Sequence, residues 1–279
     1  MIEDKGLPDS WVMQDVLWQS DTLRLEYSGP ANPTNVVVAF APIDHPFDAK
    51  GGWGAKSFAK RNMAHICVFH ARPTWHQEDD FFEAMQACRA YVGEACQVVS
   101  YGFSMGGYAA LLGAQSLRAT RAVAISPQVS IDPKTVRFER RYLDEWAEMG
   151  PWLHHLRDHM DGKREYIVVY DPLHRLDSKH ENRLPRRRGY RRVLMHGVGH
   201  SGIQACGQMG IHETLFGVLR GEIGASEMRR AFRARRPQGF RYVRKMGTLL
   251  HKRNHPLAQQ FRTMAEEGGF DRLIRKWLE

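Results

Sequence analysis

Short apolar runs separated by helix-forming stretches constrain the fold of this chain more than any other feature. Six runs are almost continuously apolar, which is typical of strands that are covered on both faces of a sheet. They lie at residues 35–40, 64–69, 96–101, 121–126, 165–170 and 191–196. A further run, residues 22–27, alternates apolar and polar side chains and predicts a half-exposed strand near a sheet edge. This alternation predicts an α/β fold with a doubly wound, mainly parallel sheet.

Two segments depart from the alternation. Residues 132–162 are rich in aromatic side chains, favour helix and lie between two strands. We interpret them as a lid insert over a pocket, with an ordinary long crossover as the alternative. After Gly224 the strand pattern stops and the sequence favours helices. We therefore expect an α/β domain over residues 1–224 and a basic helical C-terminal extension over residues 225–279.

The net charge of +9 is concentrated in this extension. Residues 225–279 contain 14 Lys and Arg against 5 Asp and Glu, which leaves 26 of each sign for residues 1–224. A charged run of this kind is most often a solvated helix face. The extension is also a candidate for binding a protein partner or an acidic surface. Nucleic acid is the least favoured partner, because the sequence contains no recognised nucleic-acid motif.

One serine lies between glycines where an apolar run becomes a helix-forming stretch. Gly102-Phe103-Ser104-Met105-Gly106 fits the pattern G-x-S-x-G. A serine on such a tight turn adopts a strained backbone and projects its hydroxyl above the sheet, so residues two positions away must be small. The alternative is an ordinary turn in which Ser104 caps the helix. We interpret Ser104 as a nucleophile.

The segment "YGFSMGGYAAL" resembles the nucleophile elbow of the α/β-hydrolase fold, in the SMGG form of many esterases. The resemblance covers roughly residues 23–218. It implies a serine hydrolase in which an acid and then a histidine follow the serine, each on a loop after a later strand.

The resemblance can be carried to particular positions. His200 lies in a glycine-rich loop after the last strand and is the expected base, with His196 as its nearest rival. Asp171 ends the penultimate strand, and its Asp-Pro pair matches the usual acid loop of the family. Asp177, six residues on, is the alternative acid. The expected triad is therefore Ser104, Asp171 and His200.

An oxyanion hole needs two backbone N–H groups. By the family rule, Met105 supplies one and the loop after residues 35–40 supplies the other. Pro42 has no N–H to donate. The second donor is therefore Ala41 or Ile43, and Ala41 is the one we expect.

These residues predict a serine hydrolase that cleaves an acyl ester or thioester of a small molecule, glycan or lipid through an acyl-enzyme. The alternatives are an acyltransferase with the same triad and a non-catalytic binding protein on the same fold. We expect neither cofactor nor metal. His196 and His200 have i, i+4 spacing, but the glycines between them argue against the helix that would align both rings on one metal ion. No secretory signal, no apolar run long enough for a membrane and no C-x-x-C pair is present, so we expect a cytoplasmic protein.

Overall fold

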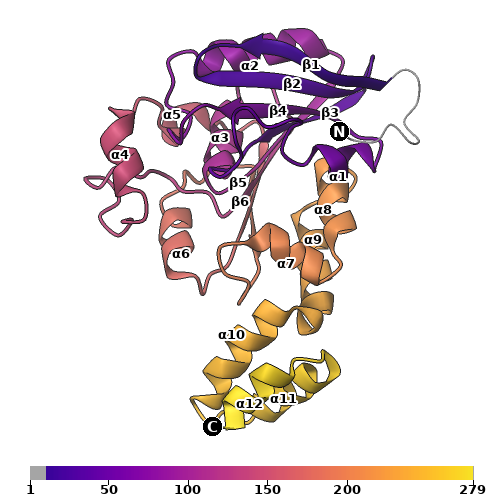
Figure 1. Ribbon diagram of the computed structural model, residues 1–279, viewed down its shortest axis with the longest axis vertical. Coiled ribbons are helices and arrows are strands. Elements are labelled where there is room, and N and C mark those ends of the chain that lie inside the picture. Colours follow the sequence, from indigo (N-terminus) through magenta and orange to yellow (C-terminus); the bar gives the residue numbers. More distant parts are fainter. Residues whose placement is uncertain (1–10, 279) are drawn as a thin grey trace. The chain divides into compact units, whose positions relative to one another are not determined.

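The computed structural model describes residues 11–278 and contains one eight-stranded sheet (Figure 1). The strands are β1 (Trp11–Gln19), β2 (Leu23–Pro30), β3 (Asn35–Phe40), β4 (Ala64–His70), β5 (Gln97–Phe103), β6 (Arg121–Ile125), β7 (Glu165–Tyr170) and β8 (Tyr190–Leu194). Their order across the sheet is β1-β2-β4-β3-β5-β6-β7-β8. The first two pairs in this order, β1–β2 and β2–β4, are antiparallel, whereas β3–β4, β3–β5 and β5–β6 are parallel. This confirms an α/β fold with a mostly parallel sheet.

The register of the central strands places their carboxyl ends together. Phe40 of β3 lies opposite Gly102 of β5, and Phe103 of β5 lies opposite Ile125 of β6. The valines of β3 have no exposed surface, as expected for a strand covered on both faces. In parallel sheets, the loops that leave these carboxyl ends are the usual place for ligand sites.

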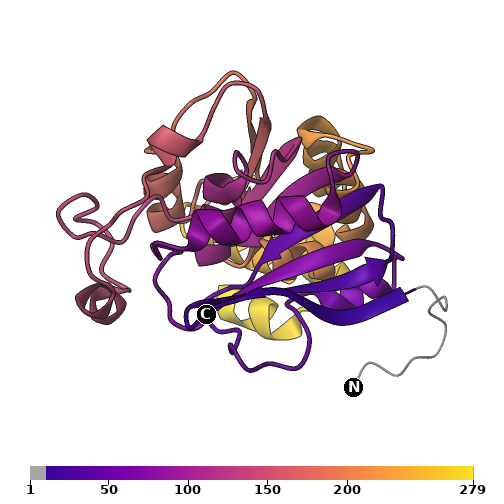
Figure 2. The same cartoon turned by 90° about the horizontal axis from the view of Figure 1, so that it is seen from above.

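The helices are α1 (Ala55–Ala59), α2 (Phe81–Val92), α3 (Met105–Gly113), α4 (Leu143–Met149), α5 (Leu156–His159), α6 (Arg175–Glu181), α7 (Gly202–Gln208), α8 (His212–Leu219), α9 (Ala225–Arg235), α10 (Phe240–His251), α11 (Ala258–Glu267) and α12 (Asp271–Leu278). A short 3₁₀ turn, Arg236–Gln238, separates α9 from α10. Figures 1 and 2 show α1 and α2 on opposite faces of the sheet edge made by β1, β2 and β4. α3 packs along β3, β5 and β6.

The described chain divides into two compact units. The first comprises residues 11–168 together with Lys179–Arg191 and holds most of the sheet. Within it, the segment 132–162 contains α4 and α5. α4 buries none of its side chains, whereas α5 packs against α3. The first unit therefore contains both the Ser104 turn and the aromatic insert.

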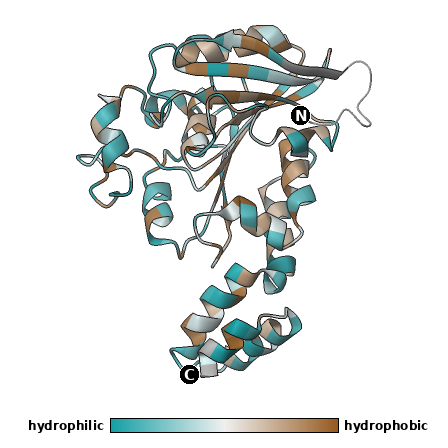
Figure 3. Ribbon diagram, in the orientation of Figure 1, coloured by the Kyte–Doolittle hydropathy of each residue, from teal (hydrophilic) through white to brown (hydrophobic). Residues whose placement is uncertain are grey.

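The second unit comprises Val169–Ser178 and residues 192–278, so it holds the His200 loop together with all the helices after Gly224. These C-terminal helices alternate between hydrophilic and hydrophobic positions (Figure 3). Their buried side chains include Phe232, Tyr242, Val243 and Phe261. α9 packs against α8, and α10 packs against α11. Residues 225–278 thus belong to the same packed body as α7 and α8. No helix within residues 11–278 combines the length and the apolar character that a bilayer crossing needs.

Candidate active site

Ser104 lies at the junction of β5 and α3 in a strained backbone conformation. Its φ is 56° and its ψ is −118°, a region that residues with a side chain rarely adopt. The Ser104 N–H donates to the Ile125 carbonyl at 2.9 Å, and the Tyr108 N–H donates to the Ser104 carbonyl at 3.2 Å. These two bonds hold the turn from both sides. They direct the serine to the carboxyl edge of the sheet, at the amino end of α3.

The flanking glycines allow this turn to pack. A Cβ on Gly102 would lie 2.0 Å from the Gly106 carbonyl oxygen, and one on Gly106 would lie 2.3 Å from the Phe40 carbonyl oxygen. Both distances are far below van der Waals contact, and both involve backbone atoms that cannot swing away. The first and last glycines of G-x-S-x-G are therefore required by the contact of α3 with β5 and β3.

The Ser104 hydroxyl has a buried partner that the sequence analysis did not identify. The Gln128 side-chain amide donates from Nε2 to Ser104 Oγ at 2.7 Å, and its Oε1 accepts from the Trp75 indole N–H at 3.3 Å. Both Gln128 and Trp75 have no exposed surface. Because an indole N–H can only donate, Trp75 fixes which end of the amide faces the serine. The one sequence feature that could have pointed to Gln128 is its position, three residues after β6, the strand next to β5, which leads into Ser104.

The loop after β3 corrects the expected oxyanion donor. The Ala41 N–H donates to the Val68 carbonyl at 3.0 Å, so it extends the β3–β4 ladder and does not face a substrate. Pro42 has no N–H, which leaves Ile43 as the candidate second donor. The Pro42 carbonyl accepts from the His45 N–H at 3.1 Å and lies 3.0 Å from His70 Nε2. In a trans peptide the C=O and N–H point in opposite directions, so these contacts aim the Ile43 N–H away from His70.

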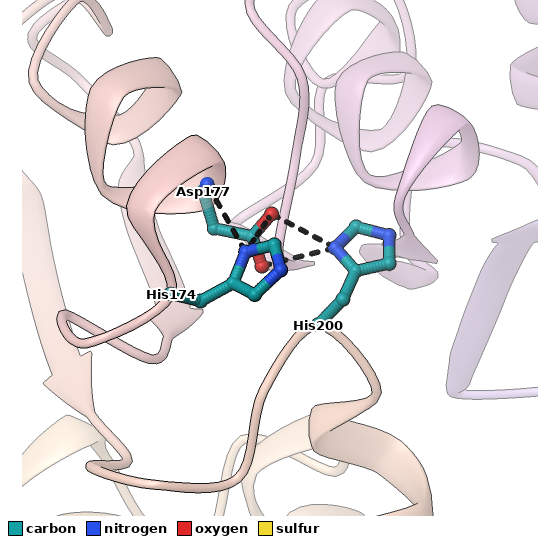
Figure 4. Close-up of side chains that lie close together, drawn as sticks. All are labelled: His174, Asp177 and His200. Carbon is teal, nitrogen blue, oxygen red and sulfur yellow. Dashed lines mark hydrogen bonds and ion pairs between the residues drawn. The ribbon is translucent and has the colours of Figure 1, made fainter. Parts of the chain in front are cut away.

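In the second unit, the structure brings His200 to Asp177. His200 Nδ1 lies 2.9 Å from both carboxylate oxygens of Asp177 (Figure 4). Asp177 is in the first turn of α6, and its side chain is 1% exposed. His174, one helical turn earlier, places its Nδ1 3.0 Å from Asp177 Oδ1. One buried carboxylate therefore serves two imidazoles.

These two histidines keep Asp177 ionised. Burial alone would raise the pKa of the Asp177 carboxyl, but hydrogen bonds from His174 and His200 and their charge outweigh the loss of solvation. The net result is a pKa well below the ordinary value of an aspartate. A carboxylate that is charged throughout the working pH range can hold the His200 Nδ1 proton and stabilise a positive imidazole.

Asp171 occupies a different position from the one expected. Its carboxylate accepts the backbone N–H groups of Leu173 at 2.8 Å, Gly197 at 3.0 Å and Gly199 at 2.8 Å. Gly197 and Gly199 both have positive φ, at 78° and 72°. Asp171 ends β7 directly, so it lies level with the backbone of the loop that carries His200. The expected Asp171–His200 pair is thus replaced by Asp177–His200, and Asp171 shapes the loop.

The same cluster contains the only candidate metal ligands among the described residues. One ligand atom each from His174, Asp177 and His200 lies within 4.8 Å of the others. Three such ligands with an open position resemble the donor set of a catalytic zinc ion. In the structure, however, both Nδ1 atoms already bond to the Asp177 carboxylate, so a metal ion would have to displace these bonds.

The candidate residues fall into two sets with complementary chemistry. The first unit holds Ser104, Gln128 and the N–H groups of Met105 and Ile43, which are a candidate nucleophile and candidate donors for negative charge. The second unit holds His200, whose Nδ1 lies against the Asp177 carboxylate, an arrangement that orients the imidazole. A hydroxyl nucleophile and an oriented imidazole are the parts that acyl transfer requires.

Comparison with solved structures supports the fold. The capsule O-acetyltransferase of Neisseria meningitidis serogroup A matches with a TM-score of 0.53 and 12% identity, over 76% of this chain and 99% of that chain. Apo Thermogutta terrifontis esterase 2 gives a TM-score of 0.48 at 16% identity, over 77% and 97% of the two chains. The acetyl xylan esterase from Paenibacillus sp. R4 gives 0.47 at 13% identity, over 72% and 80%.

The first of these likenesses shows a shared α/β fold over about three quarters of the chain. At 12% identity it shows the fold alone. No protein-family model and no curated protein sequence matches the chain. The activity therefore has to be argued from the residues.

Proposed function

We propose that this protein is a serine hydrolase of the α/β-hydrolase fold that cleaves an acyl ester or thioester through an acyl-enzyme on Ser104. The observation that carries the proposal is the backbone of Ser104, held at a φ of 56° between two glycines at the amino end of α3. A strained serine at such a junction lowers the stability of the folded protein, and strain of this kind is found chiefly at functional sites. The catalytic triad that we propose is Ser104, His200 and Asp177.

The proposed reaction has two halves. Nε2 of His200 removes the Ser104 proton while Oγ attacks the substrate carbonyl carbon, and the negative oxygen accepts hydrogen bonds from the N–H groups of Met105 and Ile43. His200 then gives the proton to the departing alcohol or thiol. A water molecule attacks the resulting acyl-serine with His200 again as base, which releases the acid. The proposal requires Nε2 and Oγ to approach within hydrogen-bond distance, about 3 Å.

Gln128 acts on the nucleophile itself in this scheme. Its amide donates to Ser104 Oγ, so it fixes the rotamer of the serine and favours the charge that builds on Oγ as the proton leaves. Trp75 keeps that amide oriented. We assign Gln128 as a positioning residue for the attack.

Acyl transfer to another acceptor is the second candidate function. It uses the same acyl-enzyme and differs only in whether water or a substrate hydroxyl completes the reaction. The similarity in fold to the capsule O-acetyltransferase supports acyl transfer as the second candidate function. We also propose that residues 132–162 form a lid, because α4 within them has no fully buried side chain. The division into residues 1–224 and a C-terminal extension over residues 225–279 is likewise a proposal from the sequence, in which α9 of the extension packs on α8 of the domain.

A fluorophosphonate probe tests the proposal without knowledge of the substrate. We expect the probe to label Ser104, as shown by peptide mapping, and Ser104→Ala to abolish labelling while the fold is retained. Ser116→Ala, which changes a serine in the turn after α3, is the matched control and should label like the wild type. Labelling at another serine would remove Ser104 as the nucleophile. No labelling of the folded protein would remove the hydrolase proposal in favour of a non-catalytic binding protein.

The choice between hydrolysis and transfer needs a second measurement. After the enzyme is mixed with p-nitrophenyl acetate, a soluble sugar or amino alcohol is added as acceptor. Acceleration of p-nitrophenol release, with formation of the acetylated acceptor, indicates a transferase. Release that is independent of the acceptor indicates a hydrolase.

A further inference from the structure

One face of α10 carries cations in its first half and at its C-terminal end. Arg241, Arg244 and Lys245 lie on it, and Lys252 follows at the C-cap. The spacings of three, four and seven residues between these positions keep all of them on one side of a helix. No acidic residue occurs in Phe240–His251. At 1.5 Å per residue, the row from the first to the last cation extends for about 16 Å.

Two cavities in the second unit lie along this face. The smaller, of about 160 Å³, is lined on one side by Arg241, Arg244 and Lys245. On its other side are Asp171, Leu173, His174 and the loop of residues 197–199, which leads into His200. The larger, of about 350 Å³, shares Arg244 and Lys245 and continues past Leu249 to Lys252 and Leu273. The two cavities are thus joined by the same two cations.

The cations on this face are not neutralised by the protein. Within residues 11–278, none of Arg241, Arg244 and Lys245 forms an ion pair with a carboxylate. The one acid that lines the smaller cavity is Asp171, whose two oxygens are engaged by three backbone N–H groups. The lining of the smaller cavity thus carries three cations against one carboxylate, and such an excess of positive charge concentrates anionic ligands.

The position of the smaller cavity links this charge to the chemistry. His174 lines it, and His174 contacts Asp177, which in turn holds His200. An anionic group in this cavity would therefore lie beside the acid–base pair. Beyond it, the larger cavity offers apolar surface from Leu249 and Leu273 between the cations.

We propose that the basic face of α10 binds the phosphate groups of the acyl donor, so that the natural donor is a phosphorylated thioester or ester. This inference rests on the proposed function, because it assigns a substrate class to the same site. Two hollows that share two cations and also offer apolar surface suit a small molecule with several phosphates and an apolar part.

Inorganic pyrophosphate tests the binding site directly, by calorimetric titration of the full chain. Arg244→Gln and Lys245→Gln should each weaken binding by about tenfold, the loss of one charged hydrogen bond. Arg233→Gln, which removes an exposed cation of α9 that lines neither cavity, is the matched control and should bind like the wild type. Raising the salt concentration should weaken binding. Equal affinity for the wild type, the two α10 variants and the control would overturn the proposal.

The donor assignment needs a pair of substrates that differ only in phosphate. Acetyl-CoA and S-acetylpantetheine carry the same thioester, and only the first is phosphorylated. We expect a lower KM for acetyl-CoA, and Lys245→Gln should raise that KM about tenfold while leaving the KM for S-acetylpantetheine within about twofold. The same KM for both donors would overturn the assignment to the donor.

These tests are independent of the catalytic proposal. Ser104→Ala should bind pyrophosphate with the affinity of the wild type, since the chemistry is not involved. Failure of fluorophosphonate labelling would remove the hydrolase while leaving the anion site. Failure of pyrophosphate binding would remove the anion site while leaving the hydrolase.

Discussion

Replacing Asp177 by asparagine removes one charge from the centre of the proposed acid–base pair. Asparagine has nearly the same shape, but its amide is neutral and one of its two ends donates. His200 Nδ1 is 2.9 Å from both carboxylate oxygens, so in Asp177→Asn an amide N–H can face that nitrogen. The imidazole would then carry its proton on Nε2, where it cannot accept one from serine. In the Ser-His-Asp triad of serine proteases, replacing the acid by its amide lowers kcat about 10⁴-fold. This loss corresponds to a rise of about 5.5 kcal/mol in the activation barrier.

Asp171→Asn is the matched control, because it makes the same chemical change six residues earlier. Asp171 holds three backbone N–H groups of its own loop and of the loop that carries His200. An amide can accept fewer of these bonds, and each buried donor left without a partner costs about 1–3 kcal/mol. We therefore expect Asp171→Asn to lower the melting temperature clearly and to lower kcat much less than Asp177→Asn does.

The assay measures kcat with p-nitrophenyl acetate together with the melting temperature of each variant. Activities are compared at a temperature at which all three proteins are folded. Asp177→Asn should be nearly inactive and should keep a melting temperature close to that of the wild type. If Asp171→Asn instead loses more activity than Asp177→Asn while folded, the catalytic acid is Asp171. The Asp177–His200 contact would then be a property of this conformation alone.

Three further outcomes are expected. Gln128→Leu should lower kcat about tenfold to a hundredfold, because it removes one or two hydrogen bonds that stabilise the transition state. It should slow fluorophosphonate labelling by the same factor. Burial raises the pKa of Glu78 to about 7, so its ionisation costs stability as the pH rises from about 4.3 through 7. Glu78→Gln should therefore stabilise the protein at pH 8, by about 2 kcal/mol after allowance for solvent screening, with no gain near pH 4 in pH-dependent melting. Truncation after Gly224 should give an insoluble product, because it removes Phe232 and Val243, which are buried in the second unit.

Much of the fold was open to prediction from the sequence. The apolar runs at residues 35–40 and 96–101 are continuous because β3 and β5 are buried on both faces, and this signal is local. The Ser104 turn was also predictable, because the glycines are fixed by backbone contacts two residues away. His200 was identified because its loop directly follows a strand. In each case the relevant neighbour is close in sequence or is fixed by the sheet.

The acid and the second oxyanion donor that we propose could not be predicted from the sequence, because each depends on which hydrogen bond a group makes across the fold. Asp171 and Asp177 are both suitable carboxylates near the end of β7. What separates them is that Gly197 and Gly199 turn their N–H groups toward the first. Ala41 has an N–H in the expected loop, yet β4 extends far enough to accept it. In both cases the hydrogen-bond partner that decides the role lies far away in the sequence.

The charge of the C-terminal segment could be predicted from the sequence, but the cavity that it lines could not. The sequence locates a net charge of +9 in residues 225–279. The spacing of Arg241, Arg244 and Lys245 places them on one face of a helix. The sequence does not show that this face lines a cavity with the loop before His200. Because the proposed base, its carboxylate and the cationic cavity all belong to the second unit, we expect substitutions on α10 to change which charged substrates are accepted. The proposed nucleophile and oxyanion donors, all in the first unit, should keep the same chemistry.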